Sequence, residues 1–314
     1  MQILLHGPDA PAWAPRLRAD VADVTVETSS TEDEAVARIA TVDAFFGNIS
    51  PRMLAAATHL QWIQTPMAGL ERYFFPELQA HPVVVTNMRG IFHDMIPDQV
   101  MAYVLAFARD LHSMIRRQLE RRWAFDEVRV LDLTRMTMGI VGLGGIGLGV
   151  ARRARPHGLR IIAVDPRQAE CPPEVDALWG VERLDDLLGE SDFVVVCAPE
   201  TPETRGLFGT EKFARMKAGS YFINIGRGRV VRLDPLVAAL ESGHLAGAAL
   251  DVFEVEPLAS DHPLWGMPNV IVTPHTAGVG AHPEDRRYEI LLENVRRFVS
   301  GAALHNVVDK HAGF

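Results

Sequence analysis

Three glycines in one short segment restrict the fold of this chain more than any other feature. Gly142, Gly144 and Gly147 follow an apolar run at Met138–Gly142 and open a helical pattern. The first glycine permits a tight turn, the second lets backbone approach a bound group, and the third allows close helix packing. Because a helix N-terminus offers free N–H groups and positive potential, this arrangement suits a pyrophosphate. The pattern predicts a strand–turn–helix unit that binds a dinucleotide.

A bare glycine motif also occurs as ordinary turn chemistry, so its surroundings matter. A second apolar run, Arg160–Val164, ends at Asp165, which lies 21 residues beyond Gly144. A carboxylate there can hydrogen-bond a ribose hydroxyl and repel a 2′-phosphate. We therefore expect NAD(H), with NADP(H) disfavoured. Two observations oppose this expectation: Arg167 weakens the exclusion of NADP(H), and Asp165 would also suit a turn before Pro166.

Two series of apolar runs alternate with helical patterns, which is typical of α/β layers with parallel sheets. The first series comprises Ile3–Leu5, Val24–Val26, Ala44–Phe46, Trp62–Ile63 and Val83–Val85. The second comprises Met138–Gly142, Ile161–Val164, Phe193–Cys197, Tyr221–Ile225, Ala248–Asp251 and Val270–Thr273. The second series predicts a doubly wound sheet of roughly six strands. Further helices are predicted to begin near Pro97 and to span Glu284–Val299.

Composition excludes several classes of function. The chain has 314 residues, 48% hydrophobic and 23% charged, which is typical of a globular protein with two domains. Its net charge of −9 argues against a nucleic-acid partner, and we interpret the basic cluster at Arg116–Arg122 as a solvated helix face. Met138–Ala151 is shorter than the roughly 20 residues of a membrane span. Cys171 and Cys197 match no metal or redox spacing. We expect no metal, no membrane association, no secretory signal and a cytoplasmic location.

Polar residues follow the last three runs of the second series, at the edge where an open α/β sheet binds ligands. Arg227 lies between two glycines, and its planar guanidinium suits a carboxylate held by two hydrogen bonds. Glu256 and His275 follow the next two runs. Taken singly, these residues would suit a surface ion pair, a solvated acid and a structural histidine. Their joint position after successive strands predicts a catalytic site.

Five segments follow one another in a fixed order: GIVGLGGIG, VCAPETPETRGLF, INIGRGRVV, GAALDVFEVEP and NVIVTPHTAG. Together they resemble the D-isomer-specific 2-hydroxyacid dehydrogenase family. The N-terminal part is less similar, with TPMAGLERY resembling the family's substrate loop and VVVTNMRG its strand before the domain crossover. Among members, PLWGMPNVIVTPH and the closing NVVDKHAGF are most similar to glyoxylate and hydroxypyruvate reductases.

The resemblance implies catalytic roles for Arg227, Glu256 and His275. Arg227 would bind the substrate carboxylate and polarise the 2-oxo group. His275 would be the acid/base that protonates the developing alkoxide during reduction, and Glu256 would orient its ring. The substrate carboxylate would also be bound by the backbone of a loop formed by Met67, Ala68 and Gly69.

The resemblance also implies how the cofactor is bound. Asp251 would orient the nicotinamide carboxamide, while Pro199 and Thr204 would line the adenine and ribose region. The expected cofactor-binding residues are Gly142, Gly144, Gly145, Ile146, Gly147, Asp165, Pro199, Thr204, Ile225, Gly226, Asp251 and His275. The chain departs from the family at Val231-Arg232, where Val-Asp is usual, and at Pro97-Asp98-Gln99, where Ala-Glu-His is common. Neither position belongs to the hydride-transfer triad, so these departures concern substrate fit or interface details and not the chemistry.

The implied architecture has two α/β domains and a catalytic cleft between them, whose closure would exclude water. A Rossmann domain with a doubly wound parallel sheet would span residues 98–282. Residues 1–97 and 283–314 would form a discontinuous, flavodoxin-like substrate domain. Members of the family are commonly dimers through the cofactor domain, so we expect a homodimer.

The expected function is NAD(H)-dependent interconversion of a small 2-oxo acid and its D-2-hydroxy acid. The alternative from another class is an NAD(H)-sensing binding protein that resembles the C-terminal binding corepressors, which share this fold and triad. The lack of a long low-complexity tail argues against that alternative. A formate dehydrogenase is disfavoured because that family has glutamine where this chain has Glu256, and phosphite oxidation stays open.

Overall fold

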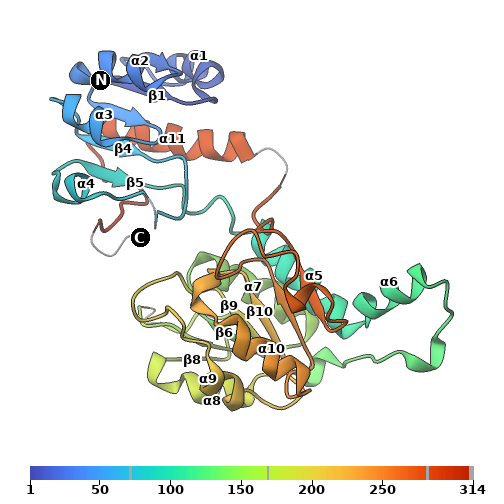
Figure 1. Ribbon diagram of the computed structural model, residues 1–314. Coiled ribbons are helices and arrows are strands. Elements are labelled where there is room, and N and C mark those ends of the chain that lie inside the picture. Colours follow the sequence, from blue (N-terminus) through green and yellow to red (C-terminus); the bar gives the residue numbers. More distant parts are fainter. Residues whose placement is uncertain (71–72, 168–169, 281–282, 311–314) are drawn as a thin grey trace. The chain divides into compact units, whose positions relative to one another are not determined.

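The structure, a computed structural model, describes residues 1–70, 73–167, 170–280 and 283–310 (Figure 1). The chain forms two compact units, a discontinuous unit of Met1–Ile91 with Gly280–Phe314 and a central unit of Phe92–Val279. The predicted domain boundaries, at 97/98 and 282/283, lie a few residues further along the chain. Residues 71–72 of TPMAGLERY and 311–314 of NVVDKHAGF lie outside the described residues.

The discontinuous unit contains a five-stranded sheet with the order β2-β1-β3-β4-β5, parallel throughout. Its strands are β1 (Gln2–His6), β2 (Thr25–Ser29), β3 (Ala44–Phe46), β4 (Trp62–Gln64) and β5 (Val84–Thr86). Its helices are α1 (Ala10–Asp20), α2 (Glu32–Arg38), α3 (Pro51–Ala56), α4 (Pro76–Ala80) and α11 (Pro283–Ser300), with a 3-10 turn η1 (Ile39–Thr41). All five predicted strands of this part are therefore confirmed, with bounds that agree to within three residues.

A buried hydrogen-bond network joins α11 to this sheet. The Asn294 amide donates to Gln64 Oε1 at 2.9 Å and exchanges hydrogen bonds with the backbone of His305. Thr86 Oγ1 donates to the same Gln64 oxygen and accepts from Trp62 Nε1, each at 2.8 Å. Because buried polar groups need partners, this network fixes the C-terminal helix against strands from the N-terminal part of the chain.

The central unit contains a seven-stranded sheet with the order β12-β11-β10-β9-β6-β7-β8, also parallel throughout. Its strands are β6 (Thr137–Val141), β7 (Arg160–Val164), β8 (Ala177–Trp179), β9 (Phe193–Val196), β10 (Tyr221–Asn224), β11 (Gly247–Leu250) and β12 (Val270–Val272). The two-domain α/β fold and the doubly wound sheet are confirmed. The edge strand β8 was not predicted, and its three residues, although apolar, are only partly buried.

Helices cover both faces of the central sheet. They are α5 (Met95–Ala108), α7 (Gly145–Ala154), α8 (Leu184–Glu190), α9 (Thr210–Arg215) and α10 (Leu233–Glu241). Helix α6 (Leu111–Leu119) follows α5 and buries none of its residues. The 3-10 turns are η2 (Phe125–Glu127), η3 (Leu133–Arg135), η4 (Arg155–His157), η5 (Val181–Arg183), η6 (Gly228–Val230) and η7 (Pro263–Trp265). Helix α5 begins at Met95, two residues before the predicted start, because the Asp94 side chain accepts a hydrogen bond from the Met95 N–H.

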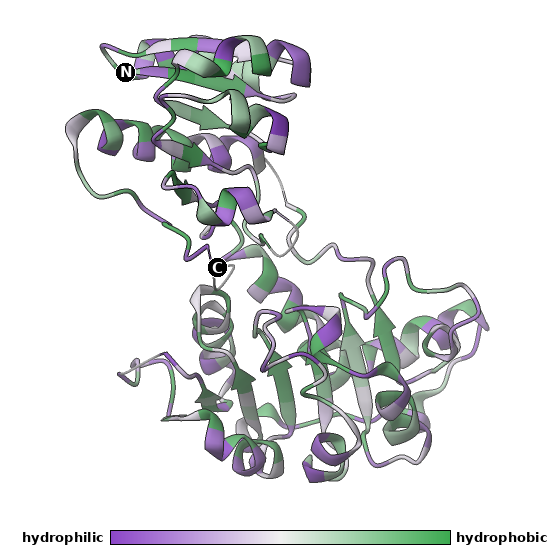
Figure 2. Cartoon of the chain, turned by 60° about the vertical axis from the view of Figure 1, so that its left-hand side comes forward, coloured by the Kyte–Doolittle hydropathy of each residue, from purple (hydrophilic) through white to green (hydrophobic). Residues whose placement is uncertain are grey.

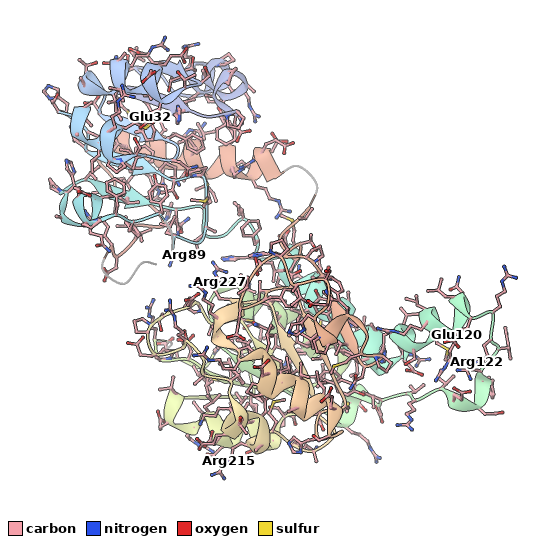
Figure 3. All side chains as sticks on the ribbon, viewed as in Figure 1. Glu32, Arg89, Glu120, Arg122, Arg215 and Arg227 are labelled. Carbon is pink, nitrogen blue, oxygen red and sulfur yellow. The ribbon has the colours of Figure 1, made fainter. Side chains whose placement is uncertain are left out.

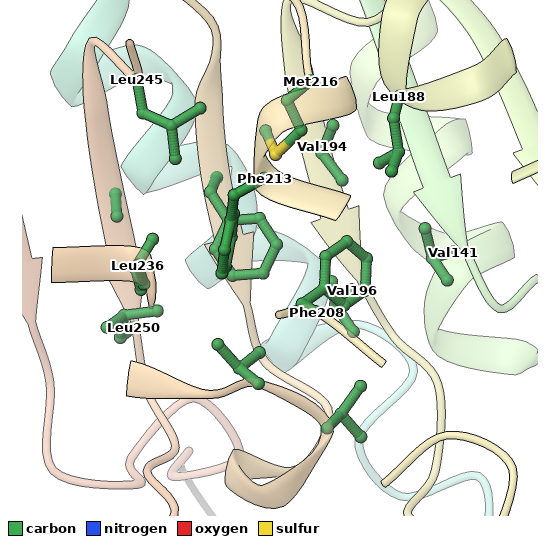
Figure 4. Close-up of a cluster of buried hydrophobic side chains, with 14 of the residues drawn as sticks. Val141, Leu188, Val194, Val196, Phe208, Phe213, Met216, Leu236, Leu245 and Leu250 are labelled. Carbon is green, nitrogen blue, oxygen red and sulfur yellow. The ribbon is translucent and has the colours of Figure 1, made fainter. Parts of the chain in front are cut away.

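The inner strands β6, β9, β10 and β11 are largely apolar, as buried faces on both sides require (Figure 2). Val141 and Val194 point into a cluster shared with α8, α9 and α10, drawn in Figure 4. Their neighbours Ile140 and Val195 point into the opposite cluster, shared with α5 and α7. This alternation builds two cores on one sheet and leaves the strand ends free to carry polar loops.

Helix α6 and the segment after it form an arm that projects from the rest of the central unit (Figure 1). The basic residues of this region are exposed at Arg121 and Arg122, as expected. The interpretation as a solvated face is wrong for Arg116 and Arg117. Arg116 donates to the backbone of Val270 at 2.9 Å, and Arg117 pairs with Asp110 at 3.3 Å. In the part of the chain that the structure describes, no helix is long and apolar enough to cross a membrane.

Candidate active site

The glycine loop lies between β6 and α7, where the sequence predicted it. Gly142 has φ +93°, and a Cβ there would lie 2.9 Å from the Ala198 nitrogen. A Cβ at Gly147 would lie 2.2 Å from the carbonyl oxygen of Gly142, so helix and turn can pack this closely only without side chains. A Cβ at Gly144 would meet nothing within 4 Å. Packing within the protein therefore does not require glycine at position 144. The open space beside Gly144 fits the approach of a dinucleotide pyrophosphate.

Asp165, at the end of β7, is tied to the glycine loop. Its Oδ2 accepts a hydrogen bond from the Leu143 N–H at 2.7 Å, and its Oδ1 accepts from the Arg167 N–H at 2.8 Å. The carboxylate is thus held at the loop by backbone donors from both sides. A carboxylate oxygen can accept more than one hydrogen bond, so the group is chemically suited to a ribose hydroxyl as well.

Gly145 and Gly149 serve a packing role that the sequence did not reveal. A Cβ at Gly145 would lie 2.2 Å from the ring of His93, and one at Gly149 would lie 2.5 Å from the His93 carbonyl oxygen. The segment leading into α5 therefore lies directly on the backbone of α7. Ile146, between the two glycines, packs against the core that α5 and α7 share.

The loop after β10 presents Arg227, which Figure 3 labels. Asn224, fully buried at the end of the strand, donates to the Arg227 carbonyl oxygen at 3.2 Å and accepts from the Gly226 N–H at 3.1 Å. A Cβ at Gly228 would lie 1.8 Å from the Phe253 carbonyl oxygen, so this loop requires glycine there. Ile225 is buried beside them. Asn224 is a positioning residue that sequence reasoning missed, and its only signal was a polar residue ending an apolar run.

His275 and Glu256 form a hydrogen-bonded pair. His275 Nδ1 lies 2.8 Å from Glu256 Oε2, and Glu256 Oε1 accepts from the Phe253 N–H at 3.0 Å. Because an ionised carboxylate only accepts hydrogen bonds, the imidazole must carry its proton on Nδ1. The Nε2 atom is then available to exchange a proton with another molecule. The His275 side chain is 55% exposed, which gives such a molecule access.

The backbone of His275 is held in the left-handed region, with φ +55°. Its N–H donates to the carbonyl oxygens of Asp251, at 2.8 Å, and Thr273, at 3.1 Å. The buried Asp251 carboxylate accepts from the N–H groups of Thr276 and Ala277, each at 2.9 Å, and from Thr273 Oγ1 at 2.5 Å. Asp251 thus shapes the turn that carries His275, and its expected contact with nicotinamide stays a prediction.

Two further loops carry the remaining predicted residues. In the central unit, Thr204 Oγ1 donates to the Pro199 carbonyl oxygen at 2.7 Å and accepts from the Thr201 N–H at 2.8 Å, so its hydroxyl closes its own loop. In the discontinuous unit, Met67, Ala68 and Gly69 follow β4. The Asn87 amide donates to the Ala68 carbonyl oxygen at 2.8 Å, and the Met67 carbonyl oxygen accepts from the Met88 N–H at 2.9 Å.

The sequence family of the chain follows from a direct comparison. The family described as D-isomer specific 2-hydroxyacid dehydrogenase, NAD binding domain, matches residues 101–277. The chain belongs to this family. It is therefore an oxidoreductase of the D-2-hydroxyacid dehydrogenase class, as the sequence predicted.

Individual relatives agree with this membership. A glyoxylate reductase of Korarchaeum cryptofilum is 35% identical over 268 residues, which cover 83% of this chain and 80% of the relative. The structure of a D-isomer specific 2-hydroxyacid dehydrogenase from Xanthobacter autotrophicus, in complex with NADPH and MES, superposes with a TM-score of 0.84, 32% identity and 99% coverage of both chains. An NADPH-dependent glyoxylate/hydroxypyruvate reductase from Sinorhizobium meliloti, in complex with NADP and sulfate, has a TM-score of 0.84 and 26% identity, covering 100% of this chain and 99% of its own.

Proposed function

We propose that this dehydrogenase interconverts a small 2-oxo acid and its D-2-hydroxy acid with Arg227, Glu256 and His275 as its catalytic residues. The observation that carries the proposal is the 2.8 Å pair of His275 Nδ1 and Glu256 Oε2, which leaves Nε2 free for proton exchange. The His275–Glu256 pair lies at the same edge of the sheet as the Arg227 loop and the glycine loop, because the carboxyl ends of parallel strands lie at one edge.

Each residue has one task in this proposal. Arg227 binds the substrate carboxylate and, through its positive charge, stabilises the oxygen that becomes an alkoxide. During reduction His275 starts as the imidazolium and donates its Nε2 proton to that oxygen, which leaves a neutral imidazole; during oxidation the neutral imidazole takes the hydroxyl proton back on Nε2. Glu256 keeps Nδ1 protonated and the ring in place. Bound nicotinamide supplies or accepts the hydride. The part of Met67, Ala68 and Gly69 in binding the carboxylate stays a prediction.

We propose NAD(H) as the preferred cofactor, with glyoxylate and hydroxypyruvate as the first substrates to test. The fixed carboxylate of Asp165 supports this preference because a 2′-phosphate beside it would meet like charge. The named structural neighbours contain NADPH or NADP, which makes NADP(H) the competing choice.

A panel of 2-oxo acids assayed with NADH and with NADPH tests both statements. We expect reduction of at least one small 2-oxo acid to its D-2-hydroxy product, identified by chiral chromatography, and a higher kcat/KM with NADH. Formation of L-product or no reduction of any member contradicts the proposed function. A higher kcat/KM with NADPH contradicts only the cofactor preference.

We further propose a homodimer formed through the arm. Leu111, Ile115 and Leu119 form a stripe on α6 and are 51%, 52% and 81% exposed, and Trp123 beyond the helix is 94% exposed. Apolar side chains gathered at this exposure favour a protein partner, and a second copy offers an identical arm by two-fold symmetry. Light scattering after size exclusion should give a dimer, and Leu119→Glu with Trp123→Glu should give a monomer. Val181→Glu, at another apolar residue that is 57% exposed, is the control.

A further inference from the structure

A chain of hydrogen bonds links helix α5 to the turn that carries His275. The Tyr103 hydroxyl lies 2.5 Å from Thr273 Oγ1, which in turn lies 2.5 Å from Asp251 Oδ1. Tyr103 and Asp251 are each only 2% exposed, and Thr273 between them is partly buried.

The donor and the acceptor of each hydrogen bond in this series can be assigned. Thr273 has one hydroxyl proton, and it must go to Asp251 because an ionised carboxylate only accepts. Tyr103 must therefore be the donor to Thr273 Oγ1. Burial raises the pKa of Tyr103, which keeps the phenol protonated and able to donate. Tyr103 of α5 thus donates to Thr273, and Thr273 donates to the Asp251 carboxylate.

The Asp251 carboxylate also hydrogen-bonds the backbone of the turn that carries His275. It accepts from the N–H groups of Thr276 and Ala277, which follow His275 directly. His275 itself has φ +55°, a conformation that a residue with a Cβ adopts only when its surroundings hold it there. The hydrogen bonds on both sides of His275 are therefore what keeps its ring opposite Glu256.

We propose that Tyr103 is a positioning residue for His275, acting through Thr273 and Asp251. This inference rests on the proposed function, since it assumes that His275 is the acid/base. Tyr103 touches neither substrate nor reacting atoms. Its hydroxyl orients Thr273 so that the Asp251 carboxylate stays where it holds the turn, and a small displacement of an acid/base from its productive position lowers the rate of the chemical step.

The substitution Tyr103→Phe removes the donor and keeps the ring. We expect kcat for 2-oxo acid reduction to fall roughly 5- to 20-fold, the effect of one lost buried hydrogen bond in the transition state. KM for the acid should stay within about twofold because Arg227 lies on a separate loop. The primary isotope effect with 4-deuterated NADH should rise, because a mispositioned acid makes hydride and proton transfer more rate-limiting. The matched control Tyr221→Phe alters a ring that packs against Phe107 and Phe193, outside the chain of hydrogen bonds, and should keep wild-type values.

Variants of Thr273 test the path itself. Thr273→Ser keeps the hydroxyl and should retain most of kcat, whereas Thr273→Val removes it and should lower kcat at least as much as Tyr103→Phe. The double variant Tyr103→Phe/Thr273→Val should be no slower than Thr273→Val alone, because both interrupt one path. If Tyr103→Phe fails to fold, the comparison of Thr273→Ser with Thr273→Val decides in its place, and equal kcat in those two variants overturns the proposal.

Two outcomes with folded Tyr103→Phe also overturn the proposal. One is a lower melting temperature with unchanged kcat and isotope effect, which would give the hydroxyl a purely structural role. The other is full additivity with Thr273→Val. Failure of the underlying function gives a different result, since the wild type would then reduce no 2-oxo acid or His275→Ala would remain fully active.

Discussion

The two units bury polar side chains for different purposes. In the discontinuous unit, Gln64 and Asn294 are 230 positions apart in sequence and hydrogen-bond each other inside the core. In the central unit, Asn224 and Asp251 bond to the backbone of loops. Those loops carry Arg227 and His275, whereas the Gln64–Asn294 pair positions none of the proposed catalytic residues. Buried polar groups therefore hold segments together in one unit and hold reactive side chains in position in the other.

The largest effect is expected where the central unit presents its acid/base. His275→Ala should lower kcat by a factor on the order of 10² to 10⁴ while the Kd for NADH changes little, because proton transfer is lost and the glycine loop is untouched. Steady-state kinetics and fluorescence titration with NADH measure the two quantities. Near-normal reduction by the variant would remove His275 from the mechanism.

Arg227→Lys should have the next largest effect. An ammonium cannot reproduce the planar pair of donors, so the substrate is both bound less tightly and aligned less well. We expect KM for a 2-oxo acid to rise and kcat to fall, with kcat/KM lower by roughly 10- to 100-fold. A rise in KM alone, at saturating NADH, would limit Arg227 to ground-state binding. Wild-type kinetics would make it a structural residue of its loop.

Buried strands could be predicted from the sequence, whereas most buried polar contacts could not. Buried strands carry continuous apolar runs, so Phe193–Cys197 and its counterparts could be recognised, whereas the edge strand β8 could not. Arg227, Glu256 and His275 could be proposed from the sequence because each follows an apolar run within a recognisable motif, and their catalytic roles stay predictions. Asn224 and Tyr103 were not found, because their roles depend on folded contacts. Tyr103 and Thr273 are 170 positions apart, and no local pattern relates them.

Asn294→Leu tests the discontinuous unit. The change removes the hydrogen bonds that the Asn294 amide makes to Gln64 and to the backbone of His305, so we expect the free energy of unfolding of this unit to fall by about 3 kcal/mol. Hydrogen exchange of the α11 amides measures the loss. Glu289→Leu, on the exposed side of the same helix, is the control and should exchange like the wild type. Because the network carries no reactive group, kcat at low temperature should change less than about twofold. A large fall in kcat with unchanged exchange would contradict the contrast between the two units.

Asp165 combines both uses of a polar side chain, since its carboxylate bonds to the backbone of Leu143 and Arg167 and is also the expected partner of the cofactor ribose. Asp165→Ser removes the negative charge, so a 2′-phosphate no longer meets repulsion. We expect the ratio of kcat/KM with NADH to that with NADPH to narrow by about 3- to 10-fold, the smallest effect considered. The companion variant Asp165→Asn removes the charge and keeps an oxygen acceptor for one of the two backbone donors, whereas Asp165→Ser also shortens the side chain. If charge governs the choice of cofactor, both variants should narrow the ratio similarly. If the ratio changes only in the serine variant, the position of the loop governs it, and an unchanged ratio in both would assign the selection to Arg167 or to another residue of the pocket.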